Sequence, residues 1–291
     1  MENIAENNNF PFFLHTGSGE NYTLRPTYDA YGQLIEVHGG SGRLRLGIDV
    51  FDVTAGDVFY LPPETVVEAA GDGFFSLRRA VFDPDSILSD VEEFDNELLQ
   101  IFAVCHRYTA RHYPAGDRVA EALSQCMEKF CDEWQAKDFC YKLMLKATVY
   151  EVMATILRDF VTSRYLRDRT TYKNILRLRP AVEYADAHYR EKVYIRELAA
   201  LTGVSEDHFE KVFRIALGRT PLEYVCFIRH SRALLRLIAT TDSVTAISRD
   251  TGFSGSTFFS NRFCDLMGVM PREYRKSGSL CTKTDEKVEK S

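Results

Sequence analysis

Hydrophobic and polar positions divide the chain into three regions with different periodicities. Between residues 20 and 83, short runs rich in β-branched and aromatic residues alternate with turn signals that contain Gly or Pro. This alternation is typical of an antiparallel sandwich or barrel. The predicted turns are Gly39-Gly40, Gly56-Asp57, Pro62-Pro63 and Gly71-Asp72-Gly73.

Residues 85–168 carry a helical pattern, with few turn signals beyond Pro114-Ala115-Gly116. Apolar residues in 117–135 recur at spacings of 3 and 4, which places them in one stripe along a helix. A second long helix is predicted over 141–164. The stripe either packs on the sheet of its own chain or pairs with a second copy. Its residues are Val119, Leu123, Met127, Phe130 and Trp134.

A near-repeat occupies the C-terminal region. Gly203 matches Gly252 at an offset of 49, and one extra residue then shifts the offset to 50. Each copy predicts a helix, a tight turn at the glycine and a second helix, which together form a helix-turn-helix unit. The pairs at the offset of 50 are Phe209 and Phe259, Phe213 and Phe263, Gly218 and Gly268, Pro221 and Pro271, Glu223 and Glu273, and Tyr224 and Tyr274.

The second helix of each unit is predicted to have one buried and one exposed face. Phe209, Val212 and Phe213 fall at helical spacing and are expected to face the core. Ser205 and Ser254 are expected to cap the free amides of the two helices. The exposed faces are the candidate DNA-binding surfaces. They comprise Ser205, Asp207, His208, Glu210, Lys211 and Arg214 in the first unit, and Ser254, Ser256, Thr257, Ser260, Asn261 and Arg262 in the second.

The second unit also carries a diagnostic family motif, formed by Gly252, Phe253, Phe259, Ser260, Phe263, Gly268, Pro271, Tyr274 and Arg275. With this motif, residues 172–276 closely resemble the AraC/XylS family of bacterial transcription regulators. Arg229 and Ala233 match the family's connecting helix, which holds the two units apart. The resemblance implies that both recognition helices enter successive major grooves of double-stranded DNA, about 34 Å apart. It also implies a homodimer, RNA polymerase as a partner, and activation rather than repression.

Two positions of the second recognition helix depart from the family pattern. Asn261 and Cys264 stand where basic residues are usual, and the first recognition helix presents carboxylates on its outer face. A carboxylate can accept a hydrogen bond from cytosine N4, but it repels phosphate. We therefore expect Lys211 and Arg214 to supply affinity at the first half-site. Asn261 is expected to read a base at the second, because its carboxamide pairs with adenine.

The front region resembles the cupin fold in two motifs, RPTYDAYGQLIEVHGG and a G-x5-P run from Gly56 to Pro62. Cupin enzymes bind a metal through His and Glu side chains, and none of the corresponding positions holds such a ligand here. The resemblance therefore implies neither metal nor other cofactor, against the alternative of a metal-dependent cupin enzyme. The corresponding positions are Thr27, Asp29, Gln33 and Val67.

Period-two alternation places one set of residues, including Ile35 and Val37, inside the predicted barrel. Its polar members, together with an aromatic ring, favour a polar small-molecule effector such as a sugar or a small acid. The alternative is an interior filled by the protein's own side chains. The candidate effector-binding residues are Arg25, Thr27, Asp29, Tyr31 and Gln33.

Charge is distributed unevenly along the chain. Residues 172–276 hold 17 Lys and Arg against 12 Asp and Glu, whereas residues 1–171 hold 16 against 27. The whole chain is acidic, with a net charge of −6, but the excess of basic residues in the C-terminal region suits a DNA backbone. The acidic front half leaves an alternative open: a regulator with decayed DNA affinity that is controlled by a protein partner.

These patterns predict an α+β protein with four segments. Residues 1–84 form a cupin-like antiparallel barrel that senses a ligand, and 85–168 form a helical dimerisation and connector region. Residues 172–276 form an all-α domain with two helix-turn-helix units, and 277–291 form a disordered tail. The joint between the two halves is expected near 167–172.

Several classes of function find no support in the sequence. Seven scattered cysteines without a CxxC pair fit reduced thiols in a cytoplasm. No apolar run approaches the roughly 18 residues of a membrane span, and the N-terminus lacks a signal-peptide pattern. No GxSxG, HExxH, P-loop or dinucleotide motif is present, so no catalytic residue and no enzyme are predicted.

Overall fold

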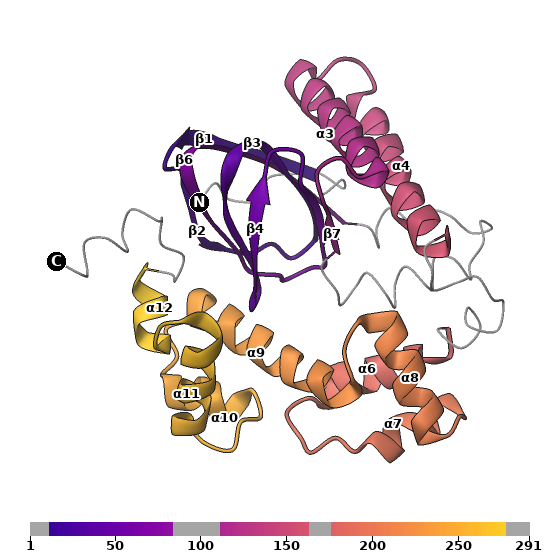
Figure 1. The fold of residues 1–291 in the computed structure, drawn as a ribbon, viewed down its shortest axis with the longest axis vertical. Helices are drawn as coiled ribbons and strands as arrows, with labels where there is room; N and C mark the ends of the chain where they lie inside the picture. Colours follow the sequence, from indigo (N-terminus) through magenta and orange to yellow (C-terminus); the bar gives the residue numbers. More distant parts are fainter. Residues whose placement is uncertain (1–11, 84–110, 163–175, 278–291) are drawn as a thin grey trace.

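The computed structural model describes residues 12–83, 111–162 and 176–277. A curled antiparallel sheet and a pair of long helices form the upper half of Figure 1, and the helices of the C-terminal region form the lower half. This arrangement confirms the α+β class. The predicted joint at 167–172 and the predicted tail beyond residue 277 lie outside the described residues.

Within the described residues, seven strands form one antiparallel sheet in the order β1-β6-β3-β5-β7, with β2 paired to β6 and β4 paired to β3. The two longest strands, β3 and β6, contact different neighbours along their two halves. The sheet therefore curls, but the pairing among the described strands does not close into a ring, so the antiparallel sheet is confirmed and the barrel stays a prediction. The strands are β1 (Phe12–Glu20), β2 (Thr23–Thr27), β3 (Gly32–Leu46), β4 (Asp49–Thr54), β5 (Val58–Leu61), β6 (Val67–Phe82) and β7 (Arg111–Tyr113).

Two of the predicted turns are instead irregularities inside long strands. Gly39 and Gly40 lie within β3, where its register against β6 shifts. Gly40 has a φ of +77°, and a Cβ there would approach the carbonyl oxygen of Phe74 to 1.8 Å. A β-bulge with glycine at this point lets the strand continue past its neighbour. The Gly71-Asp72-Gly73 run likewise lies within β6. Glycine marks both turns and bulges, which explains the wrong predictions.

The inner face of the curled sheet is filled mainly by apolar side chains. Ile35 and Val37 are buried as predicted. Val67, at one of the positions that match cupin metal ligands, belongs to the same cluster. Phe59 and Phe75 are fully buried among them. Most of the interior is therefore filled by the protein's own apolar side chains.

The long helices α3 (Arg118–Ala136) and α4 (Tyr141–Thr162) cover the outer face of the sheet (Figure 1). The carboxylate of Asp117 caps α3 by accepting a hydrogen bond from the Val119 amide at 2.6 Å. The predicted stripe on α3 packs against the sheet and α4, with Leu123, Met127 and Phe130 fully buried and Val119 and Trp134 partly buried. The stripe is thus part of its own chain's core, the first of its two interpretations. The region is also not wholly helical, because it contains the short strand β7.

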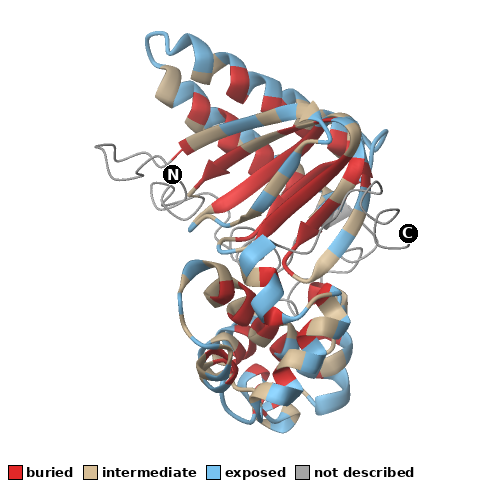
Figure 2. Ribbon diagram, turned by 90° about the vertical axis from the view of Figure 1, so that its left-hand side faces the viewer, coloured by how far each residue is buried: buried red, intermediate tan, exposed pale blue. Residues whose placement is uncertain are grey.

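The C-terminal half contains two helical cores that share one helix. The first core joins α6, α7 and α8 to the start of α9, and the second joins the end of α9 to α10, α11 and α12. Buried residues lie on the facing sides of these helices, as Figure 2 shows. The helices are α6 (Arg179–His188), α7 (Ile195–Thr202), α8 (Glu206–Leu217), α9 (Pro221–Ala239), α10 (Val244–Asp250), α11 (Ser256–Met267) and α12 (Pro271–Ser277).

Candidate nucleic-acid interface

The sequence repeat corresponds to a repeat of packing geometry. The ring of Phe213 meets that of Tyr224 edge-on, with centroids 5.4 Å apart and planes at 71°. In the second unit Phe263 and Tyr274 repeat the contact at 5.6 Å and 76°. All four rings are buried. The two helix-turn-helix units are therefore built around the same aromatic core, and each core fixes its recognition helix, α8 or α11, against the helix that follows.

The glycine turns before the recognition helices agree with the prediction, whereas the predicted capping by the two serines is corrected. Gly203 and Gly252 have φ values of +69° and +81°, the left-handed conformation predicted for both. Ser205 occupies the N-cap position of α8, although its side chain makes no capping hydrogen bond. In the second unit Gly255, not Ser254, is the N-cap of α11. Gly255 is the extra residue that shifts the repeat offset, and it lengthens the turn so that the helix begins one residue later.

The repeated residues after the recognition helices are accounted for by capping. Gly218 and Gly268 end α8 and α11 in the left-handed conformation. Thr220 and Glu223 form a complete capping box at the start of α9. Glu273 repeats half of this box, because its carboxylate accepts a hydrogen bond from the Met270 amide at 3.2 Å.

Two arginines brace the units through backbone carbonyl groups. Arg229 on α9 donates to the carbonyl oxygens of Tyr189 at 2.6 Å and Glu191 at 2.7 Å. Arg275 on α12 donates to those of Leu237 at 3.0 Å and Asp242 at 2.6 Å. The guanidinium fork suits such paired contacts. These bonds tie α9 to the loop after α6 and α12 to the end of α9, which makes the helical half a braced body.

All twelve predicted DNA-binding residues lie on the solvent side of the structure. Those of α8 and its N-cap are exposed except Glu210, which is partly buried. Those of α11 and the preceding turn are exposed except Ser256 and Ser260, which are partly buried. The arrangement thus leaves one face of each recognition helix available to a duplex. The acidic groups on α8 are Glu206, Asp207 and Glu210, and its basic groups are Lys211 and Arg214.

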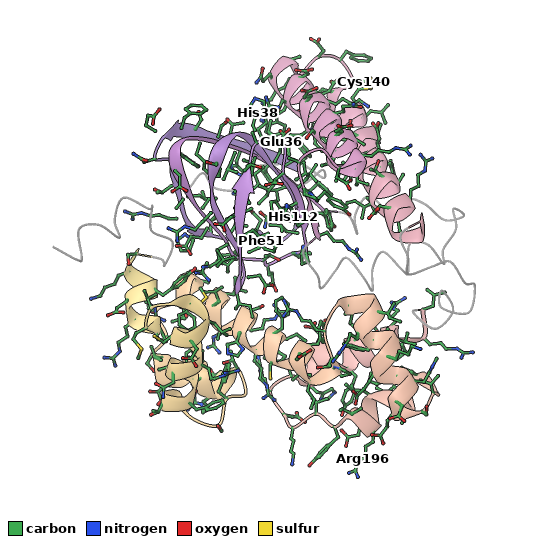
Figure 3. All side chains as sticks on the ribbon, viewed as in Figure 1. Glu36, His38, Phe51, His112, Cys140 and Arg196 are labelled. Atoms are coloured by element: carbon green, nitrogen blue, oxygen red, sulfur yellow. The ribbon has the colours of Figure 1, made fainter. Side chains whose placement is uncertain are left out.

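Sequence reasoning missed a basic cluster at the start of α7. The Lys192 ammonium and the Arg196 guanidinium both lie over the ring of Tyr194, at 4.9 and 5.1 Å from its centroid. Arg196 projects from the outer end of the helical half in Figure 3. The sequence signal for this cluster is a pair of basic residues flanking an aromatic one, outside the two recognition helices to which the phosphate contacts are predicted to belong.

One histidine is buried within the helical half. His230 on α9 places Nδ1 2.8 Å from the Cys226 carbonyl oxygen, which makes that nitrogen the donor. Its ring packs edge-on against Phe253 at 4.9 Å. Burial lowers the pKa of His230, and the nearby Arg262 and Arg229 add to the effect. The ring is therefore neutral at physiological pH and serves packing between the two units.

Two of the five predicted effector residues lie close together, and the other three lie elsewhere. Asp29 and Gln33 lie at one end of the sheet interior, where the Asp29 carboxylate is 3.3 Å from the Arg79 guanidinium. Burial lowers the pKa of Arg79, and the charge of Asp29 opposes that effect. Arg25 is exposed, whereas Tyr31 points to a different cavity between the two halves. Thr27 pairs with Val67 at the edge of β2. Arg79 was missed because the alternation was followed along β3 but not along β6.

Other polar clusters have structural explanations. His112 lies on β7 rather than on a helix, stacks on Phe59 at 4.3 Å, and is 3.2 Å from the Asp57 carboxylate. Phe51 lies beside the same ring (Figure 3). Among residues 12–83, 111–162 and 176–277, no group of three His, Cys, Asp or Glu side chains is placed to hold a metal ion. Within the same ranges no helix is both long and apolar enough to cross a membrane.

Both halves match family models. Residues 9–151 match the AraC-like ligand binding domain, and residues 198–277 match a helix-turn-helix domain. The chain belongs to the AraC family of DNA-binding transcription regulators. Its matched relatives are regulators, not enzymes.

Two relatives and one solved structure show the extent of the AraC-family likeness. The chain is 26% identical over 154 residues to the uncharacterized regulator YisR of Bacillus subtilis, covering 53% of this chain but only 51% of that protein. It is 22% identical over 278 residues to the Msm operon regulatory protein of Streptococcus mutans, covering 92% of this chain and 94% of that protein. The structure of Vibrio cholerae ToxT bound to an unsaturated fatty acid shares the fold, with a TM-score of 0.51, 14% identity, and coverage of 94% and 97%.

Proposed function

We propose that the chain is a sequence-specific DNA-binding regulator that acts in the cytoplasm, with α8 and α11 in successive major grooves. The observation that carries this proposal is the repeated aromatic core, which presents two recognition helices on one braced body. Lys211 and Arg214 supply phosphate contacts at the first half-site, and Arg262 supplies them at the second. Asn261 reads a base, with a matched adenine favoured by about 1–3 kcal/mol over other bases.

Salt dependence of binding tests this proposal. The fragment upstream of the gene itself is the duplex to use in a mobility-shift titration at several salt concentrations. The logarithm of the affinity is expected to fall by about 0.9 for each phosphate contact per tenfold rise in salt. Absence of any specific shift by the folded protein, with candidate effectors supplied, would contradict the proposal and favour control through a protein partner.

Removing the basic residues of α8 is expected to weaken binding to all duplexes about equally. For the double variant Lys211→Ala and Arg214→Ala, the salt slope should become shallower by about 1.8, because two phosphate contacts are lost. The double variant Arg118→Ala and Lys137→Ala, at exposed positions at the two ends of α3, removes the same two positive charges and is the control for the change in net charge. An unchanged slope in the double variant would show that α8 does not contact the backbone.

We also propose that the N-terminal half binds a small polar effector near Asp29, Gln33 and Arg79. Gln33 is buried and its Oε1 has no hydrogen-bond partner among the described residues, whereas Asp29 Oδ2 and Arg79 Nη1, in partly buried side chains, pair with each other at 3.3 Å. A buried acceptor without a donor is costly, and a hydroxyl group of a sugar or small acid supplies that donor beside the ion pair. Mass spectrometry of compounds retained through purification tests the assignment.

Homodimer formation is proposed through a surface different from the predicted stripe, which is buried in its own chain. Phe139, Leu143 and Met144, at the turn between α3 and α4, are 98%, 64% and 50% exposed. Apolar groups gathered in this way favour association. Light scattering at micromolar concentration should give twice the chain mass of 33.3 kDa, and Leu143→Glu should shift it toward the monomer. Ser41→Glu, at an exposed position of β3, is the control. A monomeric unmodified chain would refute the dimer.

Activation of transcription, with RNA polymerase as the partner, is the direction that we propose from the family resemblance. Expression of a reporter gene placed behind the operator shows directly whether the regulator activates or represses. Expression should rise with the intact regulator and fall when Lys211 and Arg214 are removed.

A further inference from the structure

A cavity lies between the two halves of the molecule, apart from the polar cluster inside the sheet. It has a volume of about 430 Å³ and separates the 62–66 loop of the sheet half from α9. This volume is typical of small-molecule pockets. One wall is formed by Tyr31 and Glu64, and the opposite wall by Phe227, Ser231 and Arg232. A ligand there contacts both the sheet half and the helix shared by the two DNA-binding units.

Charge around the cavity is predominantly negative. Glu64 and Asp83 from the sheet half and Asp186 from α6 line it, and Arg232 is its one basic lining residue among the described residues. Arg232 forms ion pairs with Glu64 and, at 3.6 Å, with Asp186. The carboxylates of Glu64 and Asp186 therefore share one guanidinium, so an anion entering between them meets net repulsion and a cation meets net attraction.

The remaining lining suits the organic part of such a cation. Ile228, Leu234 and Val66 supply apolar surface, and Tyr31 and Phe227 supply aromatic rings. Phe227 already accepts the Arg219 guanidinium over its ring, at 4.6 Å from the centroid, and aromatic faces attract cations generally.

We propose that this cavity binds an organic cation, namely an ammonium group on an apolar or aromatic body. The ammonium lies between Glu64 and Asp186, where it shares their carboxylates with Arg232, and the body rests on Phe227 and Ile228. Because the walls belong to both halves, the bound cation stabilises their observed relative placement. It therefore couples the sheet half to α9, and so to the spacing of the two recognition helices.

Three ligands of similar shape and different charge test the proposal by isothermal titration calorimetry at low salt. They are 2-phenylethylamine, the neutral 2-phenylethanol and the anionic 3-phenylpropionate. The amine should saturate one site with a Kd below about 1 mM, and the anion should not bind. Saturation by the anion at equal or higher affinity, or no saturation by the amine, overturns the proposal.

Paired variants locate the site. Asp186→Asn should weaken binding of the amine by about tenfold, because a carboxylate is removed while the shape is kept. Asp265→Asn, an exposed position on α11 with the same charge change, should leave the Kd unchanged. Circular dichroism checks that both variants are folded. Equal Kd values for the two variants place the amine elsewhere and overturn the assignment. The DNA-binding proposal is tested without amine, so the two can fail separately.

Discussion

Replacing Glu68 with leucine is expected to lower the free energy of unfolding by about 3–5 kcal/mol, because it leaves a buried guanidinium without its carboxylate. The side chains of Arg45 and Glu68 are only 6% and 3% exposed, and their charged atoms are 3.5 Å apart. Arg45 also reaches the Met267 sulfur at 3.4 Å, and the Tyr274 hydroxyl donates to Glu68 at 3.2 Å. The cluster joins β3 and β6 of the sheet half to α11 and α12.

The protonation states of this cluster are set by burial. Burial lowers the pKa of Arg45, and the carboxylate of Glu68 opposes that effect. Burial likewise raises the pKa of Tyr274 well above its usual range, so that its hydroxyl keeps its proton and remains a donor. Removing Glu68 therefore removes the one carboxylate among the charges that act on Arg45.

Urea unfolding of three variants measures the expectation. Besides Glu68→Leu, the double variant Arg45→Met with Glu68→Leu should recover most of the lost stability, because an apolar pair replaces the ion pair without an isolated charge. Tyr274→Phe should cost about 1.5–3 kcal/mol for one hydrogen bond to a charged group. If the single and double Glu68 variants were equally destabilised, the charge of Arg45 would not be the cause.

The contrast between this cluster and the aromatic repeat shows what the sequence could predict. Phe213 and Tyr224 lie in neighbouring helices of one unit. Their spacing, which recurs at Phe263 and Tyr274, therefore indicates the aromatic packing of both units. Arg45 and Met267 are 222 positions apart. No local periodicity predicts such a contact, because the contact depends on how the sheet half and the helical half pack against each other.

The same distinction applies to the candidate sites. The outer faces of α8 and α11 followed from helical spacing, and their exposure in the structure agrees with it. The partner of Asp29 did not follow from any spacing, because Arg79 lies on β6, 50 positions along the chain, and only the folded sheet brings it to the loop that holds Asp29. The ion pairs of Glu64 and Asp49 with Arg232 and Arg219 show a further effect: part of the acidic excess of the front half faces the basic helical half of the same chain. The net charge of the front half alone cannot show whether its acidic residues pair with the helical half, repel DNA or bind a protein partner.

Replacing Gly252 with alanine is expected to destabilise the protein much more than the matched change Gly203→Ala. Both glycines are in the left-handed conformation, with φ values of +81° and +69°, so alanine costs about 1–2 kcal/mol at either site. A Cβ at Gly203 meets nothing within 4 Å, whereas one at Gly252 lies 2.7 Å from both Cα and the carbonyl oxygen of Arg190. This backbone cannot rotate away, and overpacking adds about 1–3 kcal/mol.

The contact at Gly252 joins the two units, since Arg190 belongs to the first and Gly252 to the second. Arg229 holds the carbonyl groups on both sides of Arg190, at Tyr189 and Glu191, so that segment has little freedom to move. Relief of the clash must therefore come from a shift of the second unit. Gly252→Ala should accordingly weaken binding to an operator with the natural half-site spacing more than Gly203→Ala does, in mobility shifts at a temperature where both variants are folded. Equal losses of stability and affinity in the two variants would show that the turn of the second unit does not set the separation of the recognition helices.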